Sequence, residues 1–127
     1  MPKTYVAGAM RNHYRFNFPA FDAARDALTQ NGWDVISPAD LDRAMGFDET
    51  AFPDDYDWID LKKIGFDLFA AIDRDVAALK DCDAIFMLEG WEKSKGAKAE
   101  HALAEWMGLD LYYQKDGVPV ACEMAKQ

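Results

Sequence analysis

Cysteine, histidine and positive charge are all scarce in this chain of 127 residues. Its two cysteines, Cys82 and Cys122, lie far apart and match no zinc or redox spacing, and its two histidines, His13 and His101, are too few for an obvious metal site. We therefore expect neither a metal nor a cofactor. The formal net charge of −9 argues against a sequence-independent grip on nucleic acid, which needs a basic surface.

Long apolar runs are missing as well. No segment approaches the length of a membrane span, and the first residues lack the apolar stretch of a signal peptide. We therefore expect a cytoplasmic protein without membrane contact. The composition is globular, with 50% hydrophobic and 13% aromatic residues, and the length suits one domain over residues 1–127 with a real core.

Apolar segments alternate with helical patterns along the chain. The expected strands are residues 3–8, 33–36, 83–88 and 109–113, with 118–120 as a candidate fifth, and the expected helices are residues 18–30, 62–80 and a third from Ser94 to Gly108. Residues 40–60 give a poor signal and are interpreted as a long excursion with room for a short helix. Such alternation predicts a three-layer α/β sandwich with a parallel sheet of four to five strands.

Helical spacing also predicts which helix faces are buried. On the helix over 62–80 we expect one buried stripe, and on the helix after Ser94 a second one. The residues concerned are Leu68, Ile72, Val76 and Leu79 on the first helix, and Ala99, Ala102, Leu103 and Trp106 on the second. For Trp91 we likewise expect packing in the interior.

Two turns rich in small residues follow the first and third expected strands, at residues 8–11 and 90–96. In an open parallel sheet the carboxyl ends of the strands meet at one edge, where ligands bind, so we expect the two turns to share a crevice. Ser94 opens a helix there, and a helix start presents backbone N–H groups and a positive dipole end to an anion. The crevice therefore suits a phosphate.

Two carboxylates are the candidate catalytic groups. Glu100 lies roughly two turns beyond Ser94, where it could attack a group held beside the anion; the alternative is a solvated surface glutamate. Asp75 borders an apolar helix face, where a raised pKa becomes possible; the alternative is an ordinary ion pair with Arg74 or Lys80.

Three residues near the amino terminus share the expected crevice. Tyr5 is either a site residue or a core aromatic, Gly8 either a ligand contact or a turn glycine, and Arg11 either a phosphate ligand or a surface arginine. The acidic and aromatic residues 47–60 are either a solvated loop or a pocket wall that stacks a planar ring.

These residues carry a family resemblance. YVAGAMR at 5–11, NFPAF at 17–21 and GWEKSKGAKAE at 90–100, with shorter matches at 37–39, 75–79 and 83–85, resemble nucleoside 2-deoxyribosyltransferase-like proteins. The chain looks closest to 2′-deoxynucleoside 5′-phosphate N-hydrolase-type members and to a small phage-associated branch of unassigned function. The resemblance covers most of the chain before Gly108, apart from roughly residues 47–60.

The resemblance implies a flavodoxin-like fold, a homodimer and cleavage of the N-glycosidic bond of deoxynucleosides. It assigns the nucleophile to Glu100, handling of the base to Asp75 and orientation of the nucleophile to Tyr5. Substrate binding would fall to five residues: Gly8, Met10, Arg11, Ser94 and Gly96.

The residue at Ser94 separates two branches of that family. Transferases carry an aspartate there for the free 5′-hydroxyl, whereas the hydrolases carry a serine that binds a 5′-phosphate, and an aspartate would repel that dianion. Ser94 with Arg11 therefore favours hydrolysis of a nucleoside 5′-monophosphate. A base-exchanging transferase and a non-catalytic nucleotide-sensing module stay open as alternatives.

Overall fold

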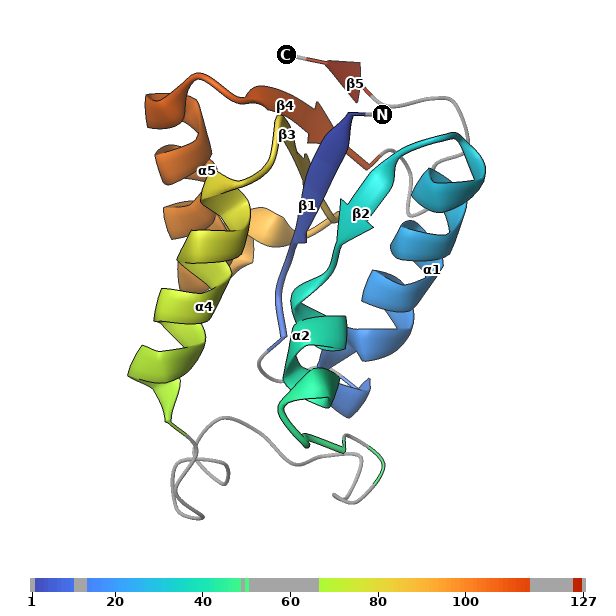
Figure 1. Ribbon diagram of the computed structural model, residues 1–127, viewed down its shortest axis with the longest axis vertical. Helices are drawn as coiled ribbons and strands as arrows, with labels where there is room; N and C mark the ends of the chain where they lie inside the picture. Colours follow the sequence, from blue (N-terminus) through green and yellow to red (C-terminus); the bar gives the residue numbers. More distant parts are fainter. Residues whose placement is uncertain (1, 11–13, 49, 51–66, 115–124, 127) are drawn as a thin grey trace.

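The central sheet has five strands in the order β2-β1-β3-β4-β5 (Figure 1). The computed structural model describes residues 2–10, 14–48, 50, 67–114 and 125–126. The strands are β1 (Lys3–Ala7), β2 (Asp34–Ile36), β3 (Ala84–Met87), β4 (Asp110–Tyr113) and β5 (Ala125–Lys126). The first four pair in parallel, and β5 pairs antiparallel with β4. The predicted flavodoxin-like α/β sandwich is therefore confirmed.

The strand order makes the chain reverse its direction of travel across the sheet between β1 and β3. From β1 the chain crosses to β2 through α1 (Phe18–Gln30), and it then returns past β1 to β3 through α4 (Leu68–Lys80). The last parallel crossover, from β3 to β4, uses α5 (Lys95–Met107). A ligand crevice is expected where such a sheet changes direction, outside the carboxyl ends of the two strands.

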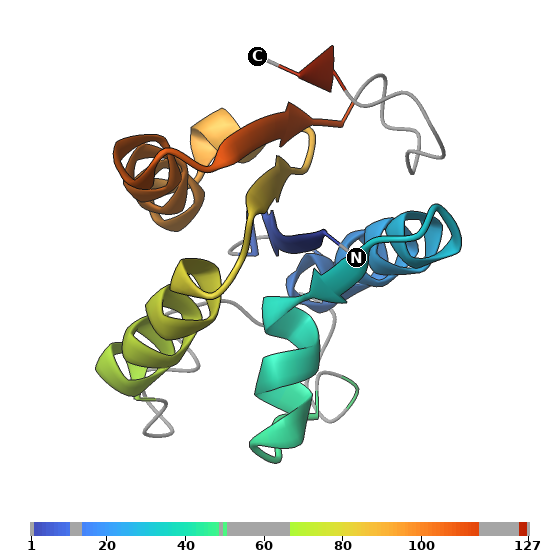
Figure 2. The ribbon, with the colours of Figure 1, turned by 45° about the horizontal axis from the view of Figure 1, so that its top comes forward.

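The helices cover both faces of this sheet. Figure 2 shows α1 on one side of the sheet and α4 with α5 on the other. Because side chains alternate along a strand, Val6 and Phe86 pack with α1, whereas Tyr5 and Ile85 pack with α4 and α5. Tyr5 therefore projects toward the helix that carries Glu100.

The helix boundaries follow local signals in the sequence. Pro19 stands in the first turn of α1, and Asn31 caps its end through its backbone N–H. Ser94 caps the start of α5 by accepting a hydrogen bond from Ala97 N–H at 3.1 Å, and Gly108 ends that helix with a φ of 79°. Short helices also lie at α2 (Pro38–Ala44), η1 (Tyr14–Asn17) and η3 (Trp91–Lys93).

The buried face predicted for α5 is wrong. Ala99 and Ala102 are exposed and Trp106 is 85% exposed, whereas Ala97 and Ala104 are buried against the sheet, with Leu103 partly buried. The small side chains at these two positions, seven residues apart on one face of the helix, let the helix backbone approach the strands. The hydrophobic spacing instead predicts a buried face that includes the larger side chains of Leu103 and Trp106.

The stripe predicted for α4 is only partly correct. Leu79 is fully buried, but Ile72 is 44% exposed, because Leu68, Ile72 and Val76 line a cavity rather than the core. Trp91 is half-buried and stacks on His101, with ring centroids 4.4 Å apart. The candidate strand at 118–120 lies outside the described residues.

Candidate active site

A cavity of about 320 Å³ lies at the edge of the sheet where β1 and β3 end. Gly8 follows β1 directly, and a Cβ atom there would lie 2.8 Å from Leu88 Cδ1, so glycine lets the two strand ends lie close together. The cavity walls come from the end of β1, from α1, α2 and α4, and from the first turns of α5. The crevice thus lies where the strand order predicts it.

The cavity brings together seven of the eight residues that the sequence nominated. They are Tyr5, Gly8, Met10, Asp75, Ser94, Gly96 and Glu100. Arg11, the eighth, lies outside the described residues. Residues from β1, α4 and α5 therefore share one pocket, although up to 95 positions separate them in the chain.

Tyr5 and Glu100 form the hydrogen bond at the centre of this pocket. The Tyr5 hydroxyl donates to Glu100 Oε2 at 2.6 Å. Burial raises the pKa of Glu100 to about 7, against the lowering effect of this hydrogen bond. Burial and the adjacent carboxylate raise the pKa of Tyr5 well above its ordinary value, so the phenol remains a donor.

Asp75 is held by its neighbour in the sequence. Arg74 donates to Asp75 Oδ1 from Nε at 3.1 Å and from Nη2 at 2.8 Å. Burial nevertheless raises the pKa of Asp75 to about 6, because it outweighs the lowering effect of the guanidinium. The ordinary ion pair considered for Asp75 is therefore present, but it lies in the wall of the pocket.

Asp42 was missed by the sequence analysis. It lies on α2, is only 9% exposed, lines the cavity and accepts a hydrogen bond from Arg74 Nη2 at 2.6 Å. Burial raises its pKa against the opposing effect of Arg74. In the sequence, Asp42 stands out only as a carboxylate three residues after the apolar residues Pro38 and Ala39. That pattern is too common to identify a site residue.

The start of α5 forms the polar end of the pocket. Ser94 Oγ accepts from Ala97 N–H, so its own hydroxyl proton is left for another acceptor. The first N–H groups of a helix have no acceptor within the helix, and the dipole makes this end positive. Ser94 and Gly96 both border the cavity, so this end can hold an anionic group.

Aromatic rings form the opposite wall. Phe16, Phe18, Phe21 and Phe47 all line the cavity, and Phe47 packs edge-on to Phe16 at a centroid distance of 5.5 Å. Phe18 and Phe21 also belong to the hydrophobic core on the α1 side of the sheet. The pocket is therefore polar near α5 and apolar near α1, an arrangement that suits a flat ring carried by a polar group.

The backbone beside this aromatic wall has an unusual conformation. Phe16 and Asn17 have positive φ angles of 57° and 64°, which non-glycine residues rarely adopt. The Asn17 side chain donates to the carbonyl of Ala9 at 2.9 Å, and this bond ties the turn to the segment after β1. Such strain concentrates at binding sites, because the surrounding structure has to hold it.

Other reactive groups lie away from the pocket. Burial raises the pKa of Cys82 to about 11, so its thiol is not a nucleophile at neutral pH. Among the residues that the structure describes, no group of three His, Cys, Asp or Glu side chains could hold a metal ion. Within the same residues, no helix is both long and apolar enough to cross a membrane.

The fold and the pocket define an α/β protein of flavodoxin-like topology with a cavity at the point where its sheet changes direction. The chain belongs to the family described as "Domain of unknown function (DUF4406)", whose model matches residues 2–113. No curated protein matches the chain. All four parallel strands and every described residue of the pocket fall within the matched segment.

Proposed function

We propose that this protein is an N-glycosidase that hydrolyses the base–sugar bond of 2′-deoxynucleoside 5′-monophosphates. The observation that carries the proposal is the position of Glu100, which lines the pocket, bonds to the buried Tyr5 and lies two turns behind an anion-binding helix start. A 5′-phosphate held at Ser94 would bring the sugar toward that carboxylate. The base would then lie near the aromatic wall, where ring stacking is favourable.

In this mechanism Glu100 attacks C1′ of the sugar as an ionised carboxylate. The C1′–N bond breaks through an oxocarbenium-like transition state while a C1′–O ester forms with Glu100. Asp75 gives its proton to the nitrogen that takes the bonding electrons, so the base leaves neutral. Water then attacks C1′ and passes a proton to the Asp75 carboxylate, while cleavage of the ester restores the Glu100 carboxylate and releases 2-deoxyribose 5-phosphate.

The two raised pKa values bring the titration of both carboxyls close to neutral pH, although the higher value at Glu100 makes the form with Glu100 ionised and Asp75 protonated the less populated one. Glu100, with a pKa of about 7, and Asp75, with a pKa of about 6, retain one proton between them over part of the neutral range. The negative charge of Asp75 also raises the pKa of Glu100, so the carboxyls influence one another. A pair with one carboxylate and one carboxylic acid supplies both a nucleophile and an acid.

Incubation with deoxynucleoside monophosphates tests the proposal. A panel of canonical and 5-substituted nucleotides, separated by chromatography, is expected to yield free base and 2-deoxyribose 5-phosphate, and Glu100→Gln is expected to yield neither. Base exchange that appears only with a second base would favour the transferase. Binding without turnover in the wild type would favour the sensing module, and full activity in Glu100→Ala would refute the mechanism.

We extend the proposal to a homodimer in the cytoplasm. The supporting observation is a set of large apolar side chains exposed on neighbouring helices: Phe69 at 79% and Ile72 at 44% on α4, and Trp106 at 85% on α5. Helices α4 and α5 contact one another on one side of the sheet (Figure 2). A second copy that packs on these helices would bury this surface and adjoin the pocket, which Ile72 also lines.

A further inference from the structure

Arg74 joins two carboxylates that line the same pocket. Its Nη2 donates to Asp42 Oδ1 at 2.6 Å and to Asp75 Oδ1 at 2.8 Å, and its Nε donates to Asp75 Oδ1 at 3.1 Å. The three side chains are 12–23% exposed, so water weakens these charge-assisted bonds less than it would at the surface. Arg74 therefore connects α2 to α4 at the site itself.

The two ends of this connection belong to different sides of the sheet. Helix α2 contributes Ala39 to the core cluster that includes α1, and α4 contributes Leu79 to the cluster on the opposite face. Their carboxylates, Asp42 and Asp75, approach each other where the two sides meet at the carboxyl end of β1. The guanidinium of Arg74 spans the gap between them.

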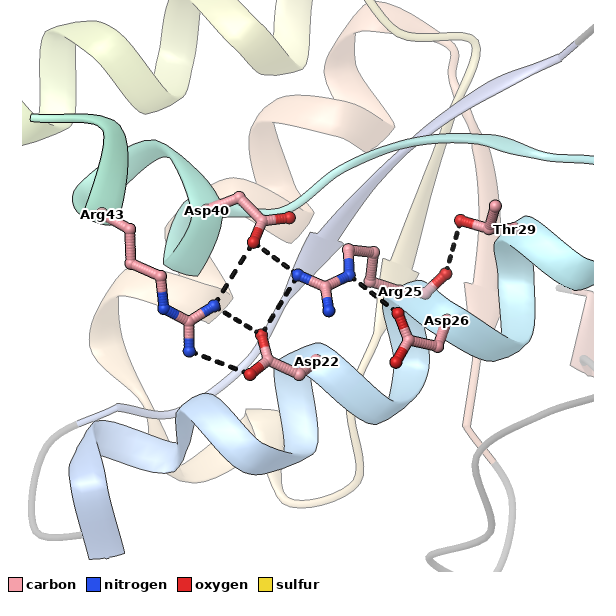
Figure 3. A network of polar contacts seen from close by, with 6 residues as sticks. All are labelled: Asp22, Arg25, Asp26, Thr29, Asp40 and Arg43. Carbon is pink, nitrogen blue, oxygen red and sulfur yellow. Dashed lines mark hydrogen bonds and ion pairs between the residues drawn. The ribbon is translucent and has the colours of Figure 1, made fainter. Parts of the chain in front are cut away.

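Helix α2 is itself firmly attached to α1. Figure 3 shows that Arg43 binds Asp22 through two hydrogen bonds, of 2.8 and 2.9 Å, and that Asp40 is shared between Arg43 and Arg25. The Arg43 guanidinium also lies 4.9 Å from the centre of the Phe18 ring, which lines the pocket. Asp42, two residues after Asp40, is thus presented to Arg74 from an anchored helix.

We propose that Arg74 is a positioning residue, which fixes the carboxyl of Asp75 by tying it to the anchored Asp42. This inference rests on the proposed function, in which Asp75 serves the leaving base. Both bonds from Arg74 end on Oδ1 of Asp75. Within the described part of the chain Oδ2 accepts no hydrogen bond, so one oxygen is held and the other is left for the substrate.

The charges around Asp75 support the same role. Arg74 lowers the pKa of Asp75, and Asp42 raises it. Among the residues that the structure describes, the other ionisable groups that line the pocket are Glu100 on α5 and Tyr5 on β1. Removal of Arg74 and removal of the Asp42 charge should therefore move the titration of Asp75 in opposite directions.

Arg74→Gln and Asp42→Asn test the proposal through the pH profile of kcat/KM on a deoxynucleoside monophosphate. Arg74→Gln is expected to lower kcat by about 10- to 100-fold with little change in KM, and to move the pH profile to higher pH, because the pKa of Asp75 rises. Asp42→Asn is expected to move the profile to lower pH. Arg74→Lys, which keeps the charge, should restore part of kcat.

Lys3→Gln is the control. Lys3 is a partly buried cation in an ion pair with Asp81, and it neither lines the pocket nor takes part in the ion pairs that anchor α2. Its loss is expected to leave the pH profile unchanged. Equal losses of kcat in Lys3→Gln and Arg74→Gln without a pH shift, or a change confined to KM, would overturn the positioning role.

A second readout separates this inference from the proposed function. Carbon-13 NMR titration of the aspartate carboxyls follows the pKa of Asp75 without any turnover. A higher pKa of Asp75 in Arg74→Gln and a lower one in Asp42→Asn would support the link from Asp42 through Arg74 to Asp75, even in a protein that releases no base. Unchanged titration of Asp75 in both variants would overturn it even in an active enzyme.

Discussion

The hydroxyl of Tyr5 and the carboxylate of Glu100 lie 2.6 Å apart, which joins the first strand to the helix that follows the third strand. The bond crosses the interior at the level of the pocket, and Tyr5 is completely buried. The fully buried hydroxyl of Tyr5 donates its hydrogen bond to Glu100, which is the proposed nucleophile. The geometry on which the proposed mechanism depends is therefore built into the core of the sheet.

Tyr5→Phe should lower kcat/KM by about 10- to 100-fold, because it removes a hydrogen bond to a charged group while keeping the ring in place. The bond lowers the pKa of Glu100, so its loss raises that pKa. Glu100 must be ionised to attack, and the pH–rate profile should therefore move to higher pH. A steady-state pH series measures both effects.

Tyr113→Phe provides the control for that experiment. Tyr113 lies on β4 and its hydroxyl is 2.6 Å from His101 Nε2 on α5, so this variant also removes a bond between a strand and α5, outside the pocket. We expect an unchanged profile. An equal shift in both variants would mean that the effect comes from the placement of α5.

Glu100→Gln should stabilise the protein above neutral pH. The folded pKa of about 7 exceeds the ordinary 4.5, so the unfolded chain ionises first and wild-type stability falls as the pH rises between these values. Glu100→Gln carries no ionisable group there, so its free energy of unfolding does not fall in this way. The difference from the wild type is at most about 3 kcal/mol above pH 7 and vanishes below pH 4.5. Urea denaturation of both proteins at pH 4 and pH 8 measures the difference.

Glu105→Gln, at an exposed position on the same helix, is the reference for general effects of charge. Its gain at pH 8 should be well below that of Glu100→Gln. Destabilisation of Glu100→Gln at pH 8 would contradict the raised pKa, since tyrosine can still donate to the amide oxygen.

The ends of α1 and α5 could be predicted from this sequence because local chemistry determines them, whereas the helix expected from residue 62 begins at Leu68, after the cap Asp67. Pro19 and Asn31 place α1, and Ser94 and Gly108 place α5, at the positions that the structure has. Gly8, Met10, Ser94 and Gly96 could be placed at the pocket for a related reason, since each follows a strand or opens a helix. Arg11 lies outside the described residues, so its role stays a prediction.

Contacts between distant segments could not be predicted in the same way. Helix α2 has seven residues and is held by ion pairs from Arg43 to Asp22 and from Arg25 to Asp40, which span 21 and 15 positions. The contact between Arg74 and Asp42 spans 32 positions. No local pattern reports such pairs, so Asp42 was missed and only Arg74 and Lys80, on the same helix, were considered as partners of Asp75.

Gly8→Ala and Gly96→Ala should separate folding from binding. A Cβ on Gly8 would lie 2.8 Å from the buried Leu88, so this variant should lose about 1–3 kcal/mol of stability. A Cβ on Gly96 meets nothing closer than Ser94 Oγ at 4.0 Å, so the fold should tolerate it. Thermal denaturation measures the first effect.

The methyl group of Gly96→Ala would point at the expected phosphate, and KM for the nucleotide should rise while Tm is kept. An unchanged KM would argue that the phosphate lies elsewhere. A loss of Tm as large as that of Gly8→Ala would show that the space around Gly96 is smaller than the geometry indicates.

Trp106→Glu should convert the proposed dimer into a monomer, because it places a charge in the surface that the second copy would bury. Met45→Glu is the control, since Met45 is 76% exposed just after α2 and belongs to neither α4 nor α5. Light scattering after size-exclusion chromatography reports the mass of each protein. A monomeric wild type, or a Trp106→Glu variant that remains dimeric, would contradict the proposed interface.

Ser94→Asp distinguishes a nucleotide from a nucleoside as the substrate. Aspartate caps helices as well as serine does, so α5 should form normally and Tm should change little. Its carboxylate would repel a phosphate dianion that serine can bind, so kcat/KM for a deoxynucleoside monophosphate should fall by at least about 100-fold. Activity on the free nucleoside should be kept or increased.

Ser94→Ala, which loses the cap and should cost about 1 kcal/mol of stability, shows how much of any effect comes from the helix start alone. Equal losses on nucleotide and nucleoside in Ser94→Asp would place the phosphate away from α5.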